Sequence, residues 1–173
     1  MKRYIVVKDR LVEIPAKMQI RALRESSVKR VLEAVEEGMD RDLNTVAVVG
    51  SLIIKGGLAV RIVTKYSGGL IYWVVQDWFG KHAWSGGFFK AGTNENIEEA
   101  AVALPAMRGR GLYPAVLKYI RKEYKKPLLS DRVMSLPNIL SWVRMEASVG
   151  VRRFRINPRS WLYHFAALET ITV

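Results

Sequence analysis

Residues 99–121, EAAVALPAMRGRGLYPAVLKYIR, constrain the fold of this chain more than any other stretch. An apolar run, Ala100 to Met107, meets a glycine-rich turn, Arg108 to Gly111, and an amphipathic helix begins directly after it. In such a strand–turn–helix junction, successive backbone N–H groups point the same way and the helix dipole adds positive character. Glycine lets an anion approach the backbone, because a β-carbon would hold it away. The stretch therefore predicts a site for a phosphate-bearing cofactor.

Two common phosphate-binding motifs do not fit this turn. The dinucleotide fingerprint needs a third glycine where this chain has Pro114. The P-loop needs a Lys-Ser/Thr pair where this chain has Leu112 and Tyr113. An ordinary strand–turn–helix junction with two glycines stays open as a purely structural alternative.

The turn resembles motif A of the GNAT superfamily, the acyl-CoA-dependent N-acyltransferases. Their pattern, roughly V-x-P-x-x-R-G-x-G, contains the core Q/R-x-x-G-x-G/A, and residues 104–111, LPAMRGRG, follow it. Arg108 takes the Q/R place and Gly111 the first glycine, whereas Tyr113 stands where Gly or Ala is usual. We expect this bulky residue to narrow the pyrophosphate site. The resemblance implies acetyl-CoA, or another acyl-CoA, as cofactor, bound by Leu104, Ala106, Met107, Arg108, Gly109, Arg110, Gly111, Leu112 and Tyr113, together with Asn138 on a later helix.

Hydrophobic periodicity predicts alternating strands and helices along the chain. We expect strands at 2–7, 46–54, 58–66, 70–76, 97–104, 128–134, 151–156 and 163–173, and helices at 15–37, after Gly111, and at 135–147. Residues 77–96 read as a glycine- and aromatic-rich connection. This order resembles the GNAT fold, which implies a single α/β domain over residues 1–173 with a mixed, splayed sheet and flanking helices. In that fold the strands at 97–104 and 128–134 part, and the pantetheine arm of CoA enters between them.

The catalytic residues are implied by the same resemblance. In the family, a tyrosine on the helix after the fifth strand protonates the leaving thiolate, in the pattern N-x-x-A-x-x-x-Y. Here Ser135 takes the place of the Asn and Trp142 that of the Tyr, and an indole N–H is not a usable acid. The usual general acid is therefore missing. Ser135 or Ser141 could offer a hydroxyl or relay a water, and nothing in the spacing selects either. Trp142 is better explained by core packing.

A general base in this family is often a carboxylate near the start of the fourth strand. Glu98 and Glu99 stand there, and because they are adjacent on a strand their side chains point to opposite faces. One of them would face the substrate and accept a proton from an amine. The alternative is that both are solvated acids at a strand end.

Composition excludes several classes of site. The chain has no cysteine, which excludes disulfides, zinc–thiolate sites and cysteine nucleophiles. The two histidines, His82 and His164, show no metal-binding spacing, so we expect no metal. No stretch approaches the roughly 20 apolar residues that cross a membrane, and the N-terminus lacks a signal peptide. We expect a cytoplasmic protein.

The formal net charge is +12, and the excess is concentrated in the C-terminal half. Residues 108–160 carry thirteen Lys and Arg against three acidic residues. A cofactor with three phosphates accounts for only a few of these cations, so the surplus favours a polyanionic partner such as DNA or RNA. A solvated basic surface that keeps the protein soluble is the alternative. The positions expected to meet nucleic acid are Lys118, Arg121, Lys122 and Lys125 on the helix and Arg152, Arg153 and Arg155 on a later strand.

We therefore expect an N-acyltransferase that moves an acetyl or other acyl group from CoA to an acceptor amine, by direct attack within a ternary complex. The alternative is a catalytically inactive protein of the same fold that binds nucleic acid or an acidic host protein through its basic C-terminal half. The short basic sequence with divergent motifs also resembles phage-encoded GNAT-like proteins, in which the acceptor amine could sit on nucleic acid or on a host protein. The acceptor, the acyl chain and the oligomeric state do not follow from the sequence.

Overall fold

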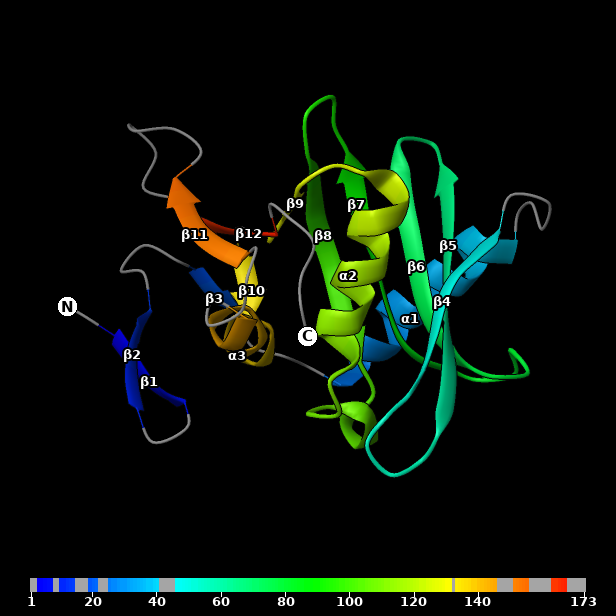
Figure 1. The fold of residues 1–173 in the computed structure, drawn as a ribbon, viewed down its shortest axis with the longest axis horizontal. Helices are drawn as coiled ribbons and strands as arrows, with labels where there is room; N and C mark the ends of the chain where they lie inside the picture. Colours follow the sequence, from blue (N-terminus) through cyan, green and yellow to red (C-terminus); the bar gives the residue numbers. More distant parts are fainter. Residues whose placement is uncertain are drawn as a thin grey trace.

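The computed structural model describes residues 3–7, 10–14, 19–21, 25–40, 46–131, 133–145, 151–155 and 163–167. A mixed eight-stranded sheet has the order β11-β12-β9-β8-β7-β6-β5-β4, with helix α1 on one face and helix α2 on the other (Figure 1). The expected α/β class with a splayed mixed sheet and flanking helices is confirmed. In chain order the elements are β1 (Arg3–Val7), β2 (Arg10–Ile14), β3 (Gln19–Arg21), α1 (Glu25–Asp40), β4 (Ala47–Ile53), β5 (Ala59–Ser67), β6 (Leu70–Asp77), β7 (Ala83–Ala91), β8 (Asn96–Ala103), the 3₁₀ turn η2 (Pro105–Met107), α2 (Leu112–Tyr124), β9 (Leu128–Leu129), β10 (Val133–Ser135), α3 (Leu136–Met145), β11 (Val151–Arg155) and β12 (Tyr163–Ala167).

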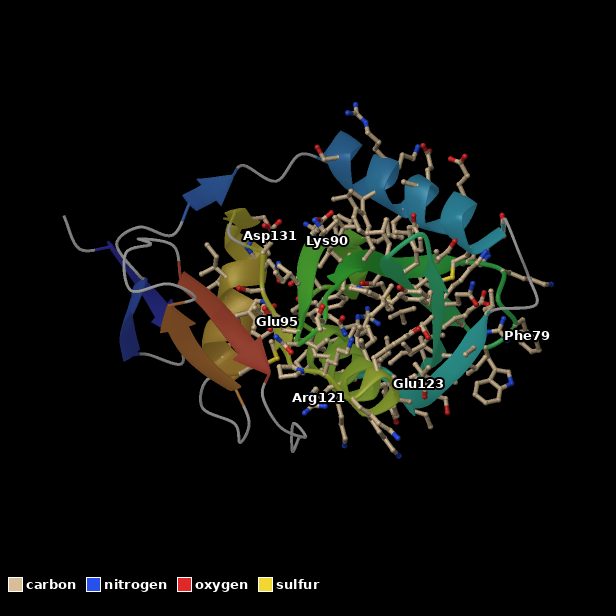
Figure 2. All side chains as sticks on the ribbon, turned by 90° about the horizontal axis from the view of Figure 1, so that it is seen from above. Phe79, Lys90, Glu95, Arg121, Glu123 and Asp131 are labelled. Atoms are coloured by element: carbon tan, nitrogen blue, oxygen red, sulfur yellow. The ribbon has the colours of Figure 1, made fainter. Side chains whose placement is uncertain are left out.

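Five consecutive antiparallel strands, β4 to β8, form the centre of the molecule, and their alternating side chains make two cores. Ile62 and Trp73 belong to the larger core on the α2 and α3 side. Val63 and Val74, one residue further along each strand, pack against α1 instead. Seen from above, the sheet lies between α1 and α2 (Figure 2).

Strand β7 corrects the prediction of an irregular connection over residues 77–96. Gly86 and Gly87 lie inside it, and glycine normally argues against a strand. At Gly87 an added β-carbon would collide with the Ala100 carbonyl oxygen and with the indole of Trp73. The glycine is therefore required by the close packing of Trp73, and it does not mark a loop.

The predicted helix over residues 15–37 is also wrong at its start. Residues 19–21 form β3, and α1 begins at Glu25. β3 pairs in parallel with β10, Gln19 opposite Val133, so a partner more than a hundred residues away overrides the local periodicity. The hairpin partner β2 was not predicted. Residues 156 and 168–173, expected to be extended, lie outside the described residues.

The strand predicted over 128–134 is divided in two, and this division creates the splay of the sheet. β9 pairs with β8 only where Asn96 faces Leu128 and Ile97 faces Leu129. β10 then turns away and pairs with β3 in a separate small sheet. Within the described residues, the edge of β8 beyond Ile97 therefore has no strand beside it on the side away from β7.

Candidate functional site

A cavity of about 630 Å³ occupies the place where β8 and the chain from β9 to β10 part. One wall is the end of β8, another is the glycine turn with the first turn of α2, and a third is α3. The lining residues are Trp73, Ser85, Ala101, Val102, Ala103, Met107, Arg108, Gly109, Gly111, Leu112, Tyr113, Pro114, Ser135, Pro137, Asn138, Leu140, Ser141 and Arg144.

The glycine turn opens directly into this cavity. Gly109 and Gly111 both have left-handed backbones, with φ of 72° and 77°, a conformation that favours glycine. A β-carbon added at either position would meet nothing within 4 Å, so the space beside the turn is open. Gly111 is the N-cap of α2 and offers no side-chain cap to the first-turn N–H groups. These backbone donors and the helix dipole favour an anion.

Two arginines on the cavity wall add positive charge to the same region. Arg108 also orders the turn, because its Nε donates to the Ala103 carbonyl oxygen at 3.1 Å. Arg144 is exposed in the last turn of α3. Arg110 does not line the cavity, since its Nη1 reaches the Lys55 carbonyl oxygen at 3.5 Å instead.

Glu98 is a buried carboxylate directly behind the cavity wall. Its side chain is 1% exposed. The hydroxyl of Tyr113 donates to Oε2, and Nδ2 of Asn138 donates to Oε1 at 3.2 Å. Burial raises the pKa of Glu98 to about 7, and the charge of Asp131 raises it too, although the bonds from Tyr113 and Asn138 act in the opposite direction.

Tyr113 links the helix to this carboxylate. Its ring lies near Trp73, with centroids 6.3 Å apart, and edge-on to Trp142, with centroids 6.0 Å apart and an interplanar angle of 78°. Because its hydroxyl bonds Glu98 on β8, the side chain reaches from α2 to the sheet. Burial and the neighbouring Glu98 charge raise the pKa of Tyr113 well above its ordinary value.

The two adjacent glutamates lie in different surroundings. Glu99 is exposed, whereas Glu98 is buried, so the alternative that both are solvated is wrong for Glu98. A β-bulge contributes to this arrangement, because Phe89 faces Glu98 and Phe88 faces Ala100, which leaves Glu99 as the extra residue. Glu98 itself does not line the cavity.

The other predicted site residues divide into two groups. Ser135 is 8% exposed and lines the cavity, and Trp142 is fully buried, which confirms its core packing. The cofactor positions that line the cavity are Met107, Arg108, Gly109, Gly111, Leu112, Tyr113 and Asn138. The cofactor positions that do not are Leu104, Ala106 and Arg110. The roles of all of them stay predictions.

Sequence reasoning named Ser141 as a possible hydroxyl donor but missed the contribution of β7 and of Arg144 to the cavity wall. Ser85 on β7 donates its hydroxyl to the Val102 carbonyl oxygen at 2.8 Å, which holds the cavity wall. Ser141 and Arg144 line the cavity from α3. The basic character of Arg144 was one available signal, but nothing local showed that β7 was a strand.

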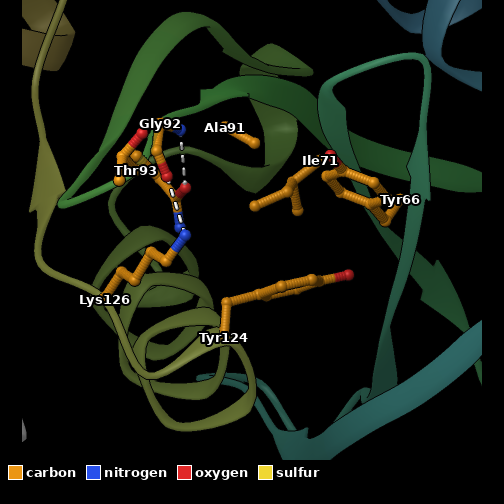
Figure 3. A pocket seen from close by; sticks show the side chains of 8 residues that line it. Tyr66, Ile71, Ala91, Gly92, Thr93, Tyr124 and Lys126 are labelled. Atoms are coloured by element: carbon orange, nitrogen blue, oxygen red, sulfur yellow. Dashed lines mark hydrogen bonds between the residues drawn. The ribbon is translucent and has the colours of Figure 1, made fainter.

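A second cavity of about 400 Å³ lies at the other end of α2 (Figure 3). Its polar groups bond one another: Lys126 Nζ donates to the Gly92 carbonyl oxygen at 2.7 Å, and the Gly92 N–H donates to Asn96 Oδ1 at 3.4 Å. The hydroxyl of Tyr124 donates to Thr64 Oγ1 at 3.2 Å. These bonds fix the loop after β7 to the end of α2, which is a structural role.

The positions expected to meet nucleic acid lie on two separate elements. On α2, Lys118 and Arg121 are partly buried, whereas Lys122 is exposed, as is Lys125 at the C-cap. Charged side chains extend from the outer side of this helix (Figure 2). Arg152, Arg153 and Arg155 belong to β11, at the far end of the sheet from β4, and their side chains lie outside the described ones.

Among the described residues, no three acidic or histidine side chains lie close enough together to hold a metal ion. No helix in the described part of the chain is long and apolar enough to cross a membrane.

No family model matches the sequence, and neither does any curated protein. Two solved structures of a cAMP-binding acyltransferase from Mycobacterium smegmatis, the protein itself and a mutant, are similar to this chain with a TM-score of 0.49 and 9% identity. They match over 84% and 83% of this chain. The chain spans about half of their length, 54% in both cases.

Proposed function

We propose that this protein transfers an acyl group, acetyl being the first candidate, from CoA to an amine within a ternary complex. One observation carries the proposal. A glycine turn at an open helix N-terminus faces the same cavity as an edge of β8 that no described strand pairs with, and a buried carboxyl–phenol pair lies at the cavity wall. This combination suits an extended ligand with phosphates at one end and a reactive group at the other.

Each part of the cavity has a task in this proposal. The turn from Arg108 to Gly111 would hold the pyrophosphate through backbone N–H groups and positive charge. The free edge of β8 over Ala101–Ala103 would bond the amides of the pantetheine arm, as a neighbouring strand otherwise would. The bound acyl-CoA supplies an activated thioester. The residues beside it, among them Ser135 and Asn138, would orient its carbonyl and exclude water.

The experiment that tests the proposal is acetyl-CoA binding by calorimetry, with two variants at Gly111. Asp and Asn are the side chains that best tolerate a left-handed backbone, and they differ from each other mainly in charge. Gly111→Asp places a negative charge beside the pyrophosphate, so we expect acetyl-CoA to bind at least tenfold more weakly than to Gly111→Asn, about 1.4 kcal/mol.

In the wild-type protein, acetyl-CoA at a hundredfold excess over Kd should raise the free energy of unfolding by about 2.7 kcal/mol. Wild-type protein that shows no binding and no stabilisation would contradict the proposal and favour the inactive binding protein. Equal affinity in the Asp and Asn variants would place the phosphates elsewhere.

A further inference from the structure

We propose that Tyr113 is the catalytic acid of this site, delivering its hydroxyl proton to the leaving thiolate, and that Glu98 acts behind it by restoring that proton. This inference rests on the proposed acyl transfer and assigns its proton chemistry to two residues. It also changes the expected role of Glu98, which sequence reasoning took as a base in direct contact with the amine.

The inference depends on which residues line the cavity and which residue lies behind them. Tyr113 and Asn138 line the cavity, whereas Glu98 does not and is 1% exposed. Both of these lining residues donate hydrogen bonds to the Glu98 carboxylate, one to each oxygen. A ligand in the cavity therefore meets Tyr113 or Asn138 before Glu98. Of the two, only the phenol of Tyr113 can release and regain a proton.

No other described group that lines the cavity is as well suited to act as the acid. The indoles of Trp73 and Trp142 flank Tyr113 and carry no usable acid. Ser85 and Ser141 donate their hydroxyls to backbone carbonyl oxygens of Val102 and Pro137. An aliphatic alcohol such as Ser135 is also a far weaker acid than a phenol. The rings of Trp73 and Trp142 pack against Tyr113, and its hydroxyl is held against Glu98, the group that would restore its proton.

Acyl transfer forms one bond to the acyl carbon and breaks another. The amine nitrogen forms a bond to the thioester carbon, the C–S bond breaks, and sulfur leaves as a thiolate. The Tyr113 hydroxyl gives its proton to sulfur, and protonated Glu98 gives its proton to the Tyr113 oxygen. The new amide nitrogen releases its proton to water in the cavity. The Tyr113 hydroxyl takes a proton from that water as it gives its own to the Glu98 carboxylate, along the hydrogen bond that the structure shows. No group is oxidised or reduced, and both residues return to their initial protonation states.

The electrostatics of the buried pair make Glu98 the source of the transferred proton. Burial and the Glu98 charge raise the pKa of Tyr113 well above its ordinary value, so the phenol is a weak donor by itself and must receive a proton from Glu98 as it gives its own to sulfur. Burial raises the pKa of Glu98 to about 7, so a large fraction of this carboxyl carries a proton at neutral pH. A group with a pKa near the working pH can give up a proton and take one back with little loss in either direction. The charge of Asp131, in the segment between β9 and β10, raises the pKa of both residues and so favours their protonated forms.

The test compares Tyr113→Phe with Tyr119→Phe. Tyr119 lies on the same helix, and its hydroxyl donates to the Ser51 carbonyl oxygen at 3.3 Å, away from the cavity. Release of free thiol from acetyl-CoA is measured with small primary amines and with a lysine-rich peptide as acceptors, between about pH 5 and pH 9. Acetyl-CoA affinity is measured in parallel by calorimetry.

We expect Tyr113→Phe to slow thiol release by about 10²–10⁴-fold, the usual contribution of a positioned acid, and to change acetyl-CoA affinity less than threefold. The variant should also lose the fall in rate above pH 7 that deprotonation of Glu98 causes in the wild type. Tyr119→Phe should keep the wild-type rate and pH profile.

A second readout needs no acceptor. Carbon NMR of the Glu98 carboxyl should show a higher pKa in Tyr113→Phe than in the wild type, because the bond from Tyr113 stabilises the carboxylate. An unchanged Glu98 pKa would overturn the contact on which the inference depends.

The two proposals fail in different ways. If wild-type protein does not bind acetyl-CoA, the proposed function fails. If it binds and turns over acetyl-CoA while Tyr113→Phe keeps the wild-type rate and pH profile, the inference about Tyr113 fails alone.

Discussion

Glu98 carries a carboxyl group whose acidity differs strongly from that of a free side chain. Its surroundings raise the pKa of its carboxyl from 4.5 to about 7, mainly by burial. The folded protein therefore holds a proton on Glu98 over a range of pH in which the unfolded chain has released it. This contribution to stability is fully present below pH 4.5 and is lost as the pH rises through 7.

The free energy of unfolding should accordingly fall by about 2–3 kcal/mol between pH 5 and pH 8, because one pKa unit corresponds to about 1.4 kcal/mol. In Glu98→Gln this part of the pH dependence should disappear, since the amide does not titrate. Urea denaturation of both proteins at the two pH values measures the difference.

Glu99→Gln is the matched control for that measurement. Glu99 is the next residue on β8 but is exposed, so its loss should leave the pH dependence as it is in the wild type. A Glu98→Gln variant that loses stability with pH as steeply as the wild type would show that Glu98 is not held protonated.

At the level of the residue, the sequence predicted part of this site. Alternation along a strand predicts different surroundings for Glu98 and Glu99, and in the structure Glu98 is buried whereas Glu99 is exposed. The sequence did not show which of the two is buried. Glu98 is covered by Tyr113 and Asn138, which lie 15 and 40 positions further along the chain. Their contact with Glu98 follows from the packing of α2 and α3, which no local pattern specifies.

At the level of the element, the strands with apolar alternation were predicted well and those with unusual composition were not. β5, β6 and β8 lie within one residue of their expected ends. β7 was not predicted, because glycines such as Gly86 and Gly87 are typical of turns; in the structure Gly87 leaves room for the Trp73 indole. The division of the strand over 128–134 depends on pairing with β3, a partner that is distant in sequence.

Two elements, α2 and β11, carry the basic residues that we propose bind nucleic acid. If six phosphates of duplex DNA are neutralised, log K should fall with log salt at a slope of about −5. Arg152→Glu combined with Arg153→Glu should flatten that slope and weaken binding to all sequences alike. Electrophoretic mobility shifts across a salt series measure it.

Lys29→Glu combined with Arg30→Glu provides the control for nucleic-acid binding. These two residues are exposed on α1, on the opposite face of the sheet from α2, and the substitution changes the net charge by the same amount. Equal weakening by both double variants would reduce the effect to net charge. If wild-type protein causes no electrophoretic mobility shift of DNA or RNA even at low salt, the proposal of nucleic-acid binding is wrong.

At the level of the whole molecule, the site exists because one sheet parts along a single line. β8 pairs with β7 along one edge, whereas on its other edge it pairs with β9 over only two residue pairs. The gap is closed by α2 and α3, which bring Tyr113 and Asn138 to the same carboxylate from two directions. A free strand edge, a helix N-terminus and a buried proton donor therefore share one cavity.

The most direct measurement of the central claim is a crystal structure of the protein with CoA bound. It should place the pyrophosphate against the backbone N–H groups of the turn from Arg108 to Leu112. The pantetheine amides should bond the free edge of β8, and the sulfur should lie within hydrogen-bonding reach of the Tyr113 hydroxyl. CoA bound outside this cavity, or bound within it with its sulfur remote from Tyr113, would contradict the account.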